Sequence, residues 1–192
     1  MATTSIWRVH GYIGKVLLYA KNPDKTTVRE SIPVPENADK NSLEDVISYA
    51  CREDATLERS LVSGVNCKPE TAREQMMRTK LLEKKTDGTM AYHGYQSFSE
   101  GEVTPAIAHE IGKRFAEELW GKYEVVVATH VDKASHIHNH FVVNTVSFVD
   151  GKKYHRTNED YRKMREVSDR LCREYGLSVI RDPQRKGKHY SQ

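Results

Sequence analysis

Four of the nine histidines in this 192-residue chain fall in one short stretch. His136, His138 and His140 occupy alternate positions, and the apolar run Phe-Val-Val that follows them favours a β-strand. Side chains two residues apart in a strand share a face, so the three imidazoles would project together. His130 closes the preceding apolar run and could join them across a hairpin. A single histidine in a strand is usually only hydrogen-bonded or solvated, but several on one rigid face favour binding of a divalent metal ion.

Two other stretches carry residues that could do chemistry. Tyr49 lies on a predicted amphipathic helix, where it falls outside the apolar stripe, so its hydroxyl group need not be buried. That stripe consists of Leu43, Val46, Ile47 and Ala50. Ser97, in the stretch Gln-Ser-Phe-Ser-Glu-Gly-Glu, would end a strand beside a turn.

Alternating and helical patterns predict the elements that must position these residues. Strands are predicted at residues 5–9, 61–65, 90–97, 123–130, 137–148 and 177–180. Helices are predicted at residues 12–20, 41–50, 69–85, 104–120 and 158–175, with Asn41 as an N-cap and Gly176 as a stop. Residues 22–40 are polar and contain three prolines, which indicates a loop or insertion, and Asp150-Gly151 indicates a tight turn. The order predicts an α+β fold in which helices pack on a mainly antiparallel sheet of about five strands.

Composition limits the class of protein. The chain is 38% hydrophobic and 30% charged, and its length suits one domain over residues 1–192. It has no apolar run of eighteen residues and no signal peptide at its start, so we expect no membrane insertion. Its three cysteines, Cys51, Cys67 and Cys172, have no paired spacing, which favours reduced thiols in a cytoplasmic protein.

The formal net charge is only +3, but basic residues are clustered. Lys153 and Arg156 follow the histidine strand, and Lys186 lies in a basic tail over residues 181–192. Most such clusters are merely solvated. Together, on either side of a candidate metal site, they favour contact with nucleic acid.

The three chemical stretches, in this order, resemble motifs I, II and III of the DNA relaxases of mobilisable plasmids and conjugative transposons, a family of HUH endonucleases. The resemblance extends over about residues 5–180. It rests on Ser42 and Tyr49 followed by Leu-Val-Ser-Gly-Val-Asn-Cys, on Ser97 in its stretch, and on Thr-His-Val-Asp followed by His-Asn-His-Phe-Val-Val-Asn. It implies a central antiparallel sheet in which the histidine strand lies in the middle and the Tyr49 helix packs nearby.

The resemblance also implies an activity and residue roles. A tyrosine hydroxyl would attack a phosphodiester of single-stranded origin-of-transfer DNA and become joined to the 5′ phosphate. Tyr49 would be the nucleophile, Asn144 would contact the phosphate or support the ligands, and Ser97 would bind DNA. The metal ligands would be His130, His138 and His140, and the ion manganese or magnesium. An adjacent DNA hairpin, accessory relaxosome and coupling proteins, and delivery with the DNA from a bacterial cytoplasm are implied as well.

Several alternatives stay open at the level of sequence. Asn139 stands between two ligands where the superfamily has a bulky apolar residue, and His136 could replace His130 as a ligand. Tyr19 is a second candidate nucleophile, since simpler family members place their tyrosine at that distance from the first strand. A non-catalytic nucleic-acid-binding module would leave the histidines unexplained, and a metal-dependent hydrolase using activated water would leave Tyr49 without a role. The chain could also be the N-terminal part of a longer protein.

Overall fold

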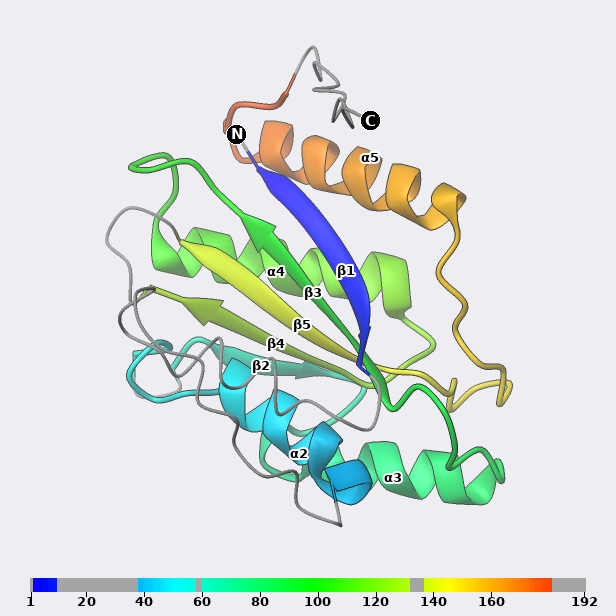
Figure 1. The fold of residues 1–192 in the computed structure, drawn as a ribbon. Helices are drawn as coiled ribbons and strands as arrows, with labels where there is room; N and C mark the ends of the chain where they lie inside the picture. Colours follow the sequence, from blue (N-terminus) through cyan, green and yellow to red (C-terminus); the bar gives the residue numbers. More distant parts are fainter. Residues whose placement is uncertain (1, 10–37, 58–59, 132–136, 181–192) are drawn as a thin grey trace, which may run out of the picture.

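A five-stranded antiparallel sheet forms the centre of the fold (Figure 1). The computed structural model describes residues 2–9, 38–57, 60–131 and 137–180, with side chains in its first helix described from Leu43 onward. The strands are β1 (Thr3–Val9), β2 (Val62–Val65), β3 (Ala91–Ser97), β4 (Val125–His130) and β5 (His138–Asn144). Their order is β1-β3-β5-β4-β2, and every neighbouring pair is antiparallel. The histidine strand β5 is therefore the middle strand, as the sequence predicted.

Helices cover both faces of this sheet. They are α2 (Ala38–Ala50), α3 (Ala72–Leu82), α4 (Pro105–Trp120) and α5 (Asn158–Glu174), and a 3-10 turn (Pro69–Thr71) precedes α3. The α4 and α5 helices pack on one face around Phe115, Trp120 and Phe141, and α4 passes behind the strands in Figure 1. The α2 and α3 helices pack on the other face, where Val46 and Met76 meet apolar side chains of β4 and β5. Because both faces are covered, β4 and β5 are almost continuously apolar between their polar ends.

Local sequence signals explain where the helices begin and end. The Thr104 side chain accepts a hydrogen bond from the Ile107 N–H at the start of α4. Thr157 and Asp160 form a capping box at the start of α5. Gly176 follows α5 with a φ of 71°, the left-handed conformation that commonly ends a helix.

Three predictions about the elements differ most from the structure. Residues 177–180 form no strand: the Leu177 N–H donates to the Cys172 carbonyl as part of the α5 C-terminal cap, and its side chain packs on the core, which accounts for the apolar signal. The first described helix begins at Ala38, so Asn41 lies inside it and residues 38–40 are not loop. Finally, β5 ends at Asn144, and Val146 instead forms an isolated bridge with Lys153 across a turn at Gly151.

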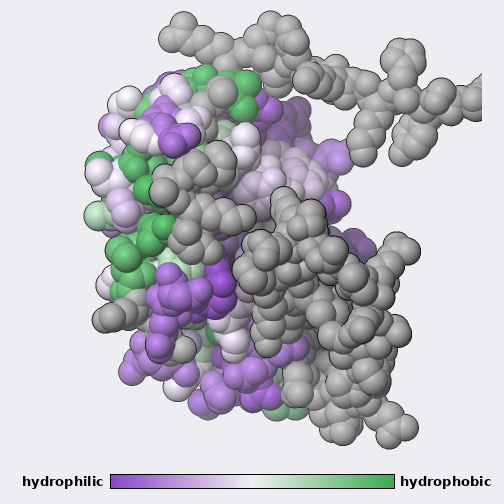
Figure 2. All heavy atoms as spheres, turned by 60° about the vertical axis from the view of Figure 1, so that its left-hand side comes forward, coloured by the Kyte–Doolittle hydropathy of each residue, from purple (hydrophilic) through white to green (hydrophobic). Residues whose placement is uncertain are grey.

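The remaining predictions on the fold concern surfaces and termini. Residues 12–20, residues 22–37 and the tail over 181–192 lie outside the described residues. Within the described ranges, no helix is both long and apolar enough to cross a membrane. Hydrophilic side chains cover much of the described surface in Figure 2, with hydrophobic ones between them, as the charged fraction predicted. The three cysteines are free, and burial raises the pKa of Cys67 to about 12.

Candidate metal centre and nucleophile

Three histidines converge at one end of the two central strands. His130 is the last residue of β4 and lies directly opposite His138, the first residue of β5, while His140 follows on the same face. One ring nitrogen from each comes within 4.8 Å of the others. The ring centroids are 5.2 Å apart for His130 and His138, 4.2 Å for His130 and His140, and 4.8 Å for His138 and His140. Of the histidines named from the sequence, only His136 lies outside the described residues.

Hydrogen bonds select which nitrogen each buried ligand would offer. The His130 Nε2 atom lies 2.8 Å from the Ala50 carbonyl oxygen, which can only accept, so Nε2 carries the proton and Nδ1 holds the lone pair. The His140 Nδ1 atom lies 2.9 Å from Nε2 of His93. Among the described residues, the buried Nε2 of His140 has no hydrogen-bond partner. A buried polar atom of this kind, beside two other imidazoles, fits a divalent ion.

The fourth ring, His93, is a residue that sequence reasoning missed. It lies on β3, on the same face of the sheet as the triad, and only 1% of it is exposed. Burial, reinforced by the nearby His130, lowers the pKa of His93 to about 3. Burial likewise lowers the pKa of His140 well below its usual value, so both rings are neutral at neutral pH. The alternation of His93 with Tyr95 and Ser97 is visible in the sequence, but the pairing of β3 with β5, which brings His93 to the triad, is not.

Tyr49 lies beside this cluster, in the last turn of α2. Its ring centroid is 5.4 Å from that of His140, 5.7 Å from that of His130 and 6.0 Å from that of His93. The Arg52 guanidinium carbon lies 5.3 Å from the same centroid. The apolar stripe of α2 is buried against the sheet while Tyr49 is only half-buried, as its position off the stripe predicted. The rival Tyr19 lies outside the described residues.

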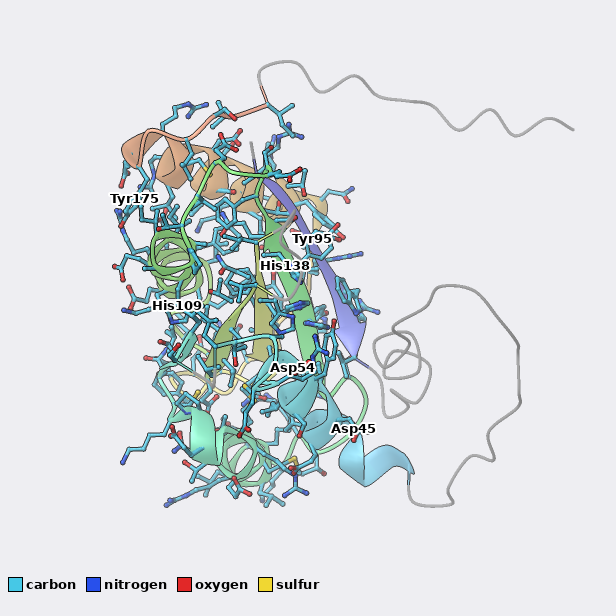
Figure 3. The ribbon with its side chains drawn as sticks, turned by 90° about the vertical axis from the view of Figure 1, so that its left-hand side faces the viewer. Asp45, Asp54, Tyr95, His109, His138 and Tyr175 are labelled. Atoms are coloured by element: carbon cyan, nitrogen blue, oxygen red, sulfur yellow. The ribbon has the colours of Figure 1, made fainter. Side chains whose placement is uncertain are left out.

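Ser97 also lies at this end of the sheet. It pairs with His138 across β3 and β5, so its half-buried side chain is on the triad face. Figure 3 views the sheet from the side and labels His138 and Tyr95 near this end, with His109 on α4 across the sheet. The structure therefore brings together the triad, Tyr49 and Ser97.

Asn144 does not lie with the triad, although it shares the face of β5. It is four residues beyond His140, which separates them by about 13 Å along a strand. Its amide nitrogen donates to Glu124 at 2.8 Å, and its amide oxygen accepts from the buried Lys80. Lys80 also donates to Thr145 at 3.0 Å. The alternating pattern predicted that Asn144 lies on the triad face of β5, and it does. Its side chain, however, belongs to a buried polar cluster that joins α3 to β4 and β5.

Two of the basic residues that were expected to contact DNA, Lys153 and Arg156, also lie away from the triad. Lys153 bridges to Val146, beyond the far end of β5, and its ammonium group contacts Asp87 at 3.1 Å. Arg156 donates to the Ile6 carbonyl at 2.8 Å and contacts the Tyr161 ring. Both follow the histidine strand closely in sequence, but the length of β5 carries them away from the triad. Lys186 lies outside the described residues.

Asn139, which separates two ligands, points to the opposite face and is completely buried. Its amide oxygen accepts from the Thr129 hydroxyl at 2.6 Å, and its amide nitrogen donates to Gln96 at 3.1 Å and to the Ala108 carbonyl at 2.8 Å. A Cβ atom at Gly112 would lie 2.6 Å from the Asn139 amide nitrogen, so glycine permits this approach of α4. The polar residue is therefore fully accommodated behind the ligands.

A central histidine strand between antiparallel neighbours, with a tyrosine helix against its metal-binding face, defines a relaxase-type nuclease domain. The chain matches the family described as "Relaxase: MobA/VirD2-like, nuclease domain" over residues 49–177, and it belongs to that family.

Known proteins are similar in sequence and in fold. The chain is 40% identical over 117 residues to protein rlx of Staphylococcus aureus, covering 61% of this chain and 37% of that protein. It is 28% identical over 207 residues to the group II intron-interrupted relaxase LtrB of Lactococcus lactis subsp. cremoris, covering 84% of this chain and 34% of that protein. The chain thus spans little more than a third of the curated relatives' length. The MobM relaxase domain, solved with 26-nucleotide pMV158 oriT DNA, shares the fold with a TM-score of 0.54 at 14% identity, covering 99% and 96% of the two chains. A second structure of that domain, bound to manganese and oriT DNA, has a TM-score of 0.55 at 12% identity and covers 99% of this chain and 94% of that one.

Proposed function

We propose that this chain is a DNA relaxase domain that nicks one strand of single-stranded origin-of-transfer DNA to begin conjugative transfer. The observation that carries the proposal is the His130, His138 and His140 triad beside a half-buried tyrosine on the nearest helix. Membership of the relaxase family supports it. So does the fold shared with a relaxase domain that was solved with oriT DNA.

The proposed reaction is a reversible transesterification. The tyrosine hydroxyl oxygen attacks the phosphorus, its proton passes to solvent, and a new oxygen–phosphorus bond forms. The bond from phosphorus to the 3′ oxygen breaks, and that oxygen takes a proton to become a free 3′ hydroxyl. Because the 5′-phosphotyrosine bond replaces the bond that was broken, the 3′ hydroxyl can later attack it and reseal the strand.

The triad residues fit a bound divalent ion. Nδ1 of His130 holds a lone pair, Nε2 of His140 has no hydrogen-bond partner among the described residues, and neutral rings leave the charge of an ion uncompensated. Such an ion would polarise the scissile phosphate and stabilise its developing charge. Manganese accepts imidazole ligands more readily than magnesium, which prefers oxygen, so we propose manganese as the more effective of the two.

We assign the nucleophile to Tyr49 and retain Tyr19 as the alternative. Tyr49 is supported by its ring contacts with His130 and His140 and by its partial exposure. A phenol has an ordinary pKa of about 10 and needs a nearby positive group to favour the phenolate. The Arg52 guanidinium group over the Tyr49 ring is one such group. Ser97, opposite His138, would contact the DNA strand near the scissile phosphate.

A covalent-adduct assay tests both the activity and the nucleophile. The protein, Tyr49→Phe and Tyr19→Phe are each incubated with manganese and single-stranded DNA covering the transfer origin of the element that encodes the chain. We expect wild-type protein and Tyr19→Phe to form an adduct that survives denaturing electrophoresis, and Tyr49→Phe to form none. Tyr95→Phe is a matched control, because it removes another hydroxyl from the triad face of the sheet and should leave the adduct intact.

Each other outcome of the assay identifies an alternative. An adduct that persists in Tyr49→Phe and is lost in Tyr19→Phe would transfer the role to Tyr19. Cleaved DNA without any adduct would indicate a hydrolase that uses activated water. Binding of DNA without cleavage, unaffected by removal of manganese, would indicate a non-catalytic nucleic-acid-binding module.

The wider setting belongs to the same proposal. The chain would act in the bacterial cytoplasm with accessory relaxosome and coupling proteins, and it would travel with the DNA into the recipient cell. A hairpin next to the nick site would be part of the bound DNA, and Lys186 would help to hold the strand. Pull-down from a donor strain that carries the element, followed by mass spectrometry, tests the protein partners directly.

A further inference from the structure

His93 is a buried ring that nothing in the proposed reaction uses, and it pairs with the candidate ligand His140. The His93 Nε2 atom lies 2.9 Å from the His140 Nδ1 atom, and the two rings are stacked with centroids 5.0 Å apart. The Trp7 ring, 4.7 Å from His93, covers it from β1. Both histidines are almost fully buried, so water does not compete for this hydrogen bond.

We propose that His93 is a positioning residue that fixes the tautomer and the orientation of the metal ligand His140. A metal at Nε2 of His140 occupies that lone pair, so the ring proton must sit on Nδ1. The Nδ1–H group then donates to Nε2 of His93, which holds the His93 proton on its own Nδ1. The hydrogen bond to His93 occupies Nδ1 of His140 and leaves Nε2 for the ion.

The chemistry of His93 has a consequence for the ion. Ligating histidines commonly donate to a carboxylate, a backbone carbonyl or water, and a carboxylate adds negative charge to the site. His93 accepts the hydrogen bond as a neutral ring and adds none. The partner of His140 therefore orients the ligand without reducing the electrophilicity that phosphodiester cleavage requires. This inference rests on the proposed metal centre but not on which tyrosine attacks.

Manganese affinity provides the test, measured by calorimetry on the wild type, His93→Leu and His93→Gln without DNA. We expect His93→Leu to bind Mn²⁺ about 10- to 100-fold more weakly. His93→Gln should recover much of the affinity, because its amide oxygen can accept the same hydrogen bond. The exposed His155 provides the matched control, since His155→Leu removes an imidazole without touching the site. In the metal-loaded wild type, the ¹⁵N spectrum should show His140 protonated at Nδ1.

The outcomes separate this inference from the proposed function. Wild-type affinity in His93→Leu, or His140 protonated at Nε2, would overturn the role of His93 and leave the nuclease intact. No Mn²⁺ binding by the wild type would overturn the metal centre and this inference with it. Circular dichroism of each variant identifies loss of folding, and a folded His93→Gln with no recovery would also contradict the proposal.

A second, independent observation is a basic recess of about 420 Å³ between the edge strand β1 and α5. Thr3 and Thr4 line it from the strand, and Arg162 and Arg165 line it from the helix, with Asp169 as the acidic neighbour. The Arg165 Nη2 atom is buried and, within the described part of the chain, has no hydrogen-bond partner. A buried guanidinium nitrogen without a partner is costly, and an anionic oxygen in the recess would satisfy it.

The recess lies at the β1 edge of the sheet on the side of α5, opposite the face that carries the triad, and Thr3 is its residue on the triad face. Thr3 pairs with Ser97, and Ser97 pairs with His138, so the three residues form a row across β1, β3 and β5. Two strand spacings separate Thr3 from His138, which is about 10 Å. The geometry points to a subsite for a backbone phosphate of the bound single strand, beyond the nucleotides at the triad. This assignment also rests on the proposed function.

Binding of oligothymidylates tests the subsite without knowledge of the origin sequence. Removing one phosphate contact should weaken binding of an oligomer of about 16 nucleotides several-fold and reduce its salt slope by about one, while an oligomer of about four is little affected. We expect Arg165→Gln to weaken binding of the longer oligomer and to reduce its salt slope in this way. The exposed Lys163→Gln on the same helix makes the same change of charge and should leave both unchanged. Equal effects of the two substitutions would show that the recess contributes only general surface charge and is not a phosphate subsite. Failure of the wild type to bind any oligomer would overturn the phosphate subsite, while the covalent-adduct assay on origin DNA tests the proposed function separately.

Discussion

At the scale of single residues, Asn139 occupies the position between two candidate ligands where the family resemblance predicts a bulky apolar side chain. It points away from His138 and His140 into a row of buried polar groups, where both its amide oxygen and its amide nitrogen are satisfied. Buried amides of this kind stabilise only when every partner is present. The network therefore anchors the backbone between the two candidate ligands.

Replacement of Asn139 by leucine, a bulky apolar residue of the kind the resemblance predicts there, is expected to destabilise the protein by about 1–3 kcal/mol. The Thr129 hydroxyl, the Gln96 amide and the Ala108 carbonyl would each lose a partner without access to water. Urea unfolding measures the change. Asn158→Leu, at an exposed position of α5, should stay within about 0.5 kcal/mol. Equal stability of the wild type and Asn139→Leu would show that the network is dispensable.

The convergence of the three candidate ligands could be predicted from sequence because its signal is local. His138 and His140 alternate on one strand, and His130 ends the strand before it, so two short-range patterns define the triad. His93 could not be linked with them, since its contact depends on β3 pairing with β5 across 47 residues of chain. Residue type and spacing therefore indicate ligands, whereas the groups that orient them require the topology.

At the scale of elements, the strands β3, β4 and β5 and the helices α4 and α5 were predictable because periodic apolar patterns and capping residues agreed. The expected strand at residues 177–180 failed because apolar side chains that complete a helix cap resemble a short strand. Asn144 lies away from the triad for a different reason. Alternation predicts the face of a strand, but a residue on the same face can still lie at the other end of the strand.

The cluster that holds Asn144 gives α3 a pH-dependent attachment to the sheet. Lys80 is 1% exposed, and burial lowers its pKa from 10.5 to about 7, with the nearby Glu124 opposing that shift. Between about pH 7 and the unfolded value, the unfolded chain binds a proton that the folded chain does not. The contribution of Lys80 to the free energy of unfolding therefore rises with pH in that window, by up to about 1.4 kcal/mol per pH unit. Below pH 7 this contribution is constant.

Lys80→Met is expected to remove this dependence. The free energy of unfolding of the wild type minus that of the variant should rise between pH 7 and pH 9, as measured by urea titrations across the range. Other titrating groups cancel in the difference, because both proteins contain them. Lys163→Met, on the exposed side of α5, should give a difference that does not change with pH. A flat difference for Lys80→Met as well would mean that the buried ammonium group keeps its proton throughout.

At the scale of the whole molecule, the proposed metal centre lies where separate parts of the chain meet. The triad links the end of β4 to the start of β5, and the His130 hydrogen bond to the Ala50 carbonyl ties α2 to the same point. The rings of His93, His130 and His140 are buried there and have little hydration. An ion bound there would connect the α2 side of the sheet with its central strands.

Manganese should therefore stabilise the entire fold and not only its site. A ligand that binds only the folded state stabilises it by about 2.7 kcal/mol at a concentration 100 times its Kd, which raises the melting temperature by several degrees for a chain of this size. Thermal unfolding with and without Mn²⁺ measures the effect, and addition of EDTA should reverse it. His140→Ala removes a ligand and should abolish the increase, whereas the exposed His155→Ala should retain it. An increase of the same size in His140→Ala would place the bound ion elsewhere on the molecule, and no increase in the wild type would contradict a metal centre that links α2, β4 and β5.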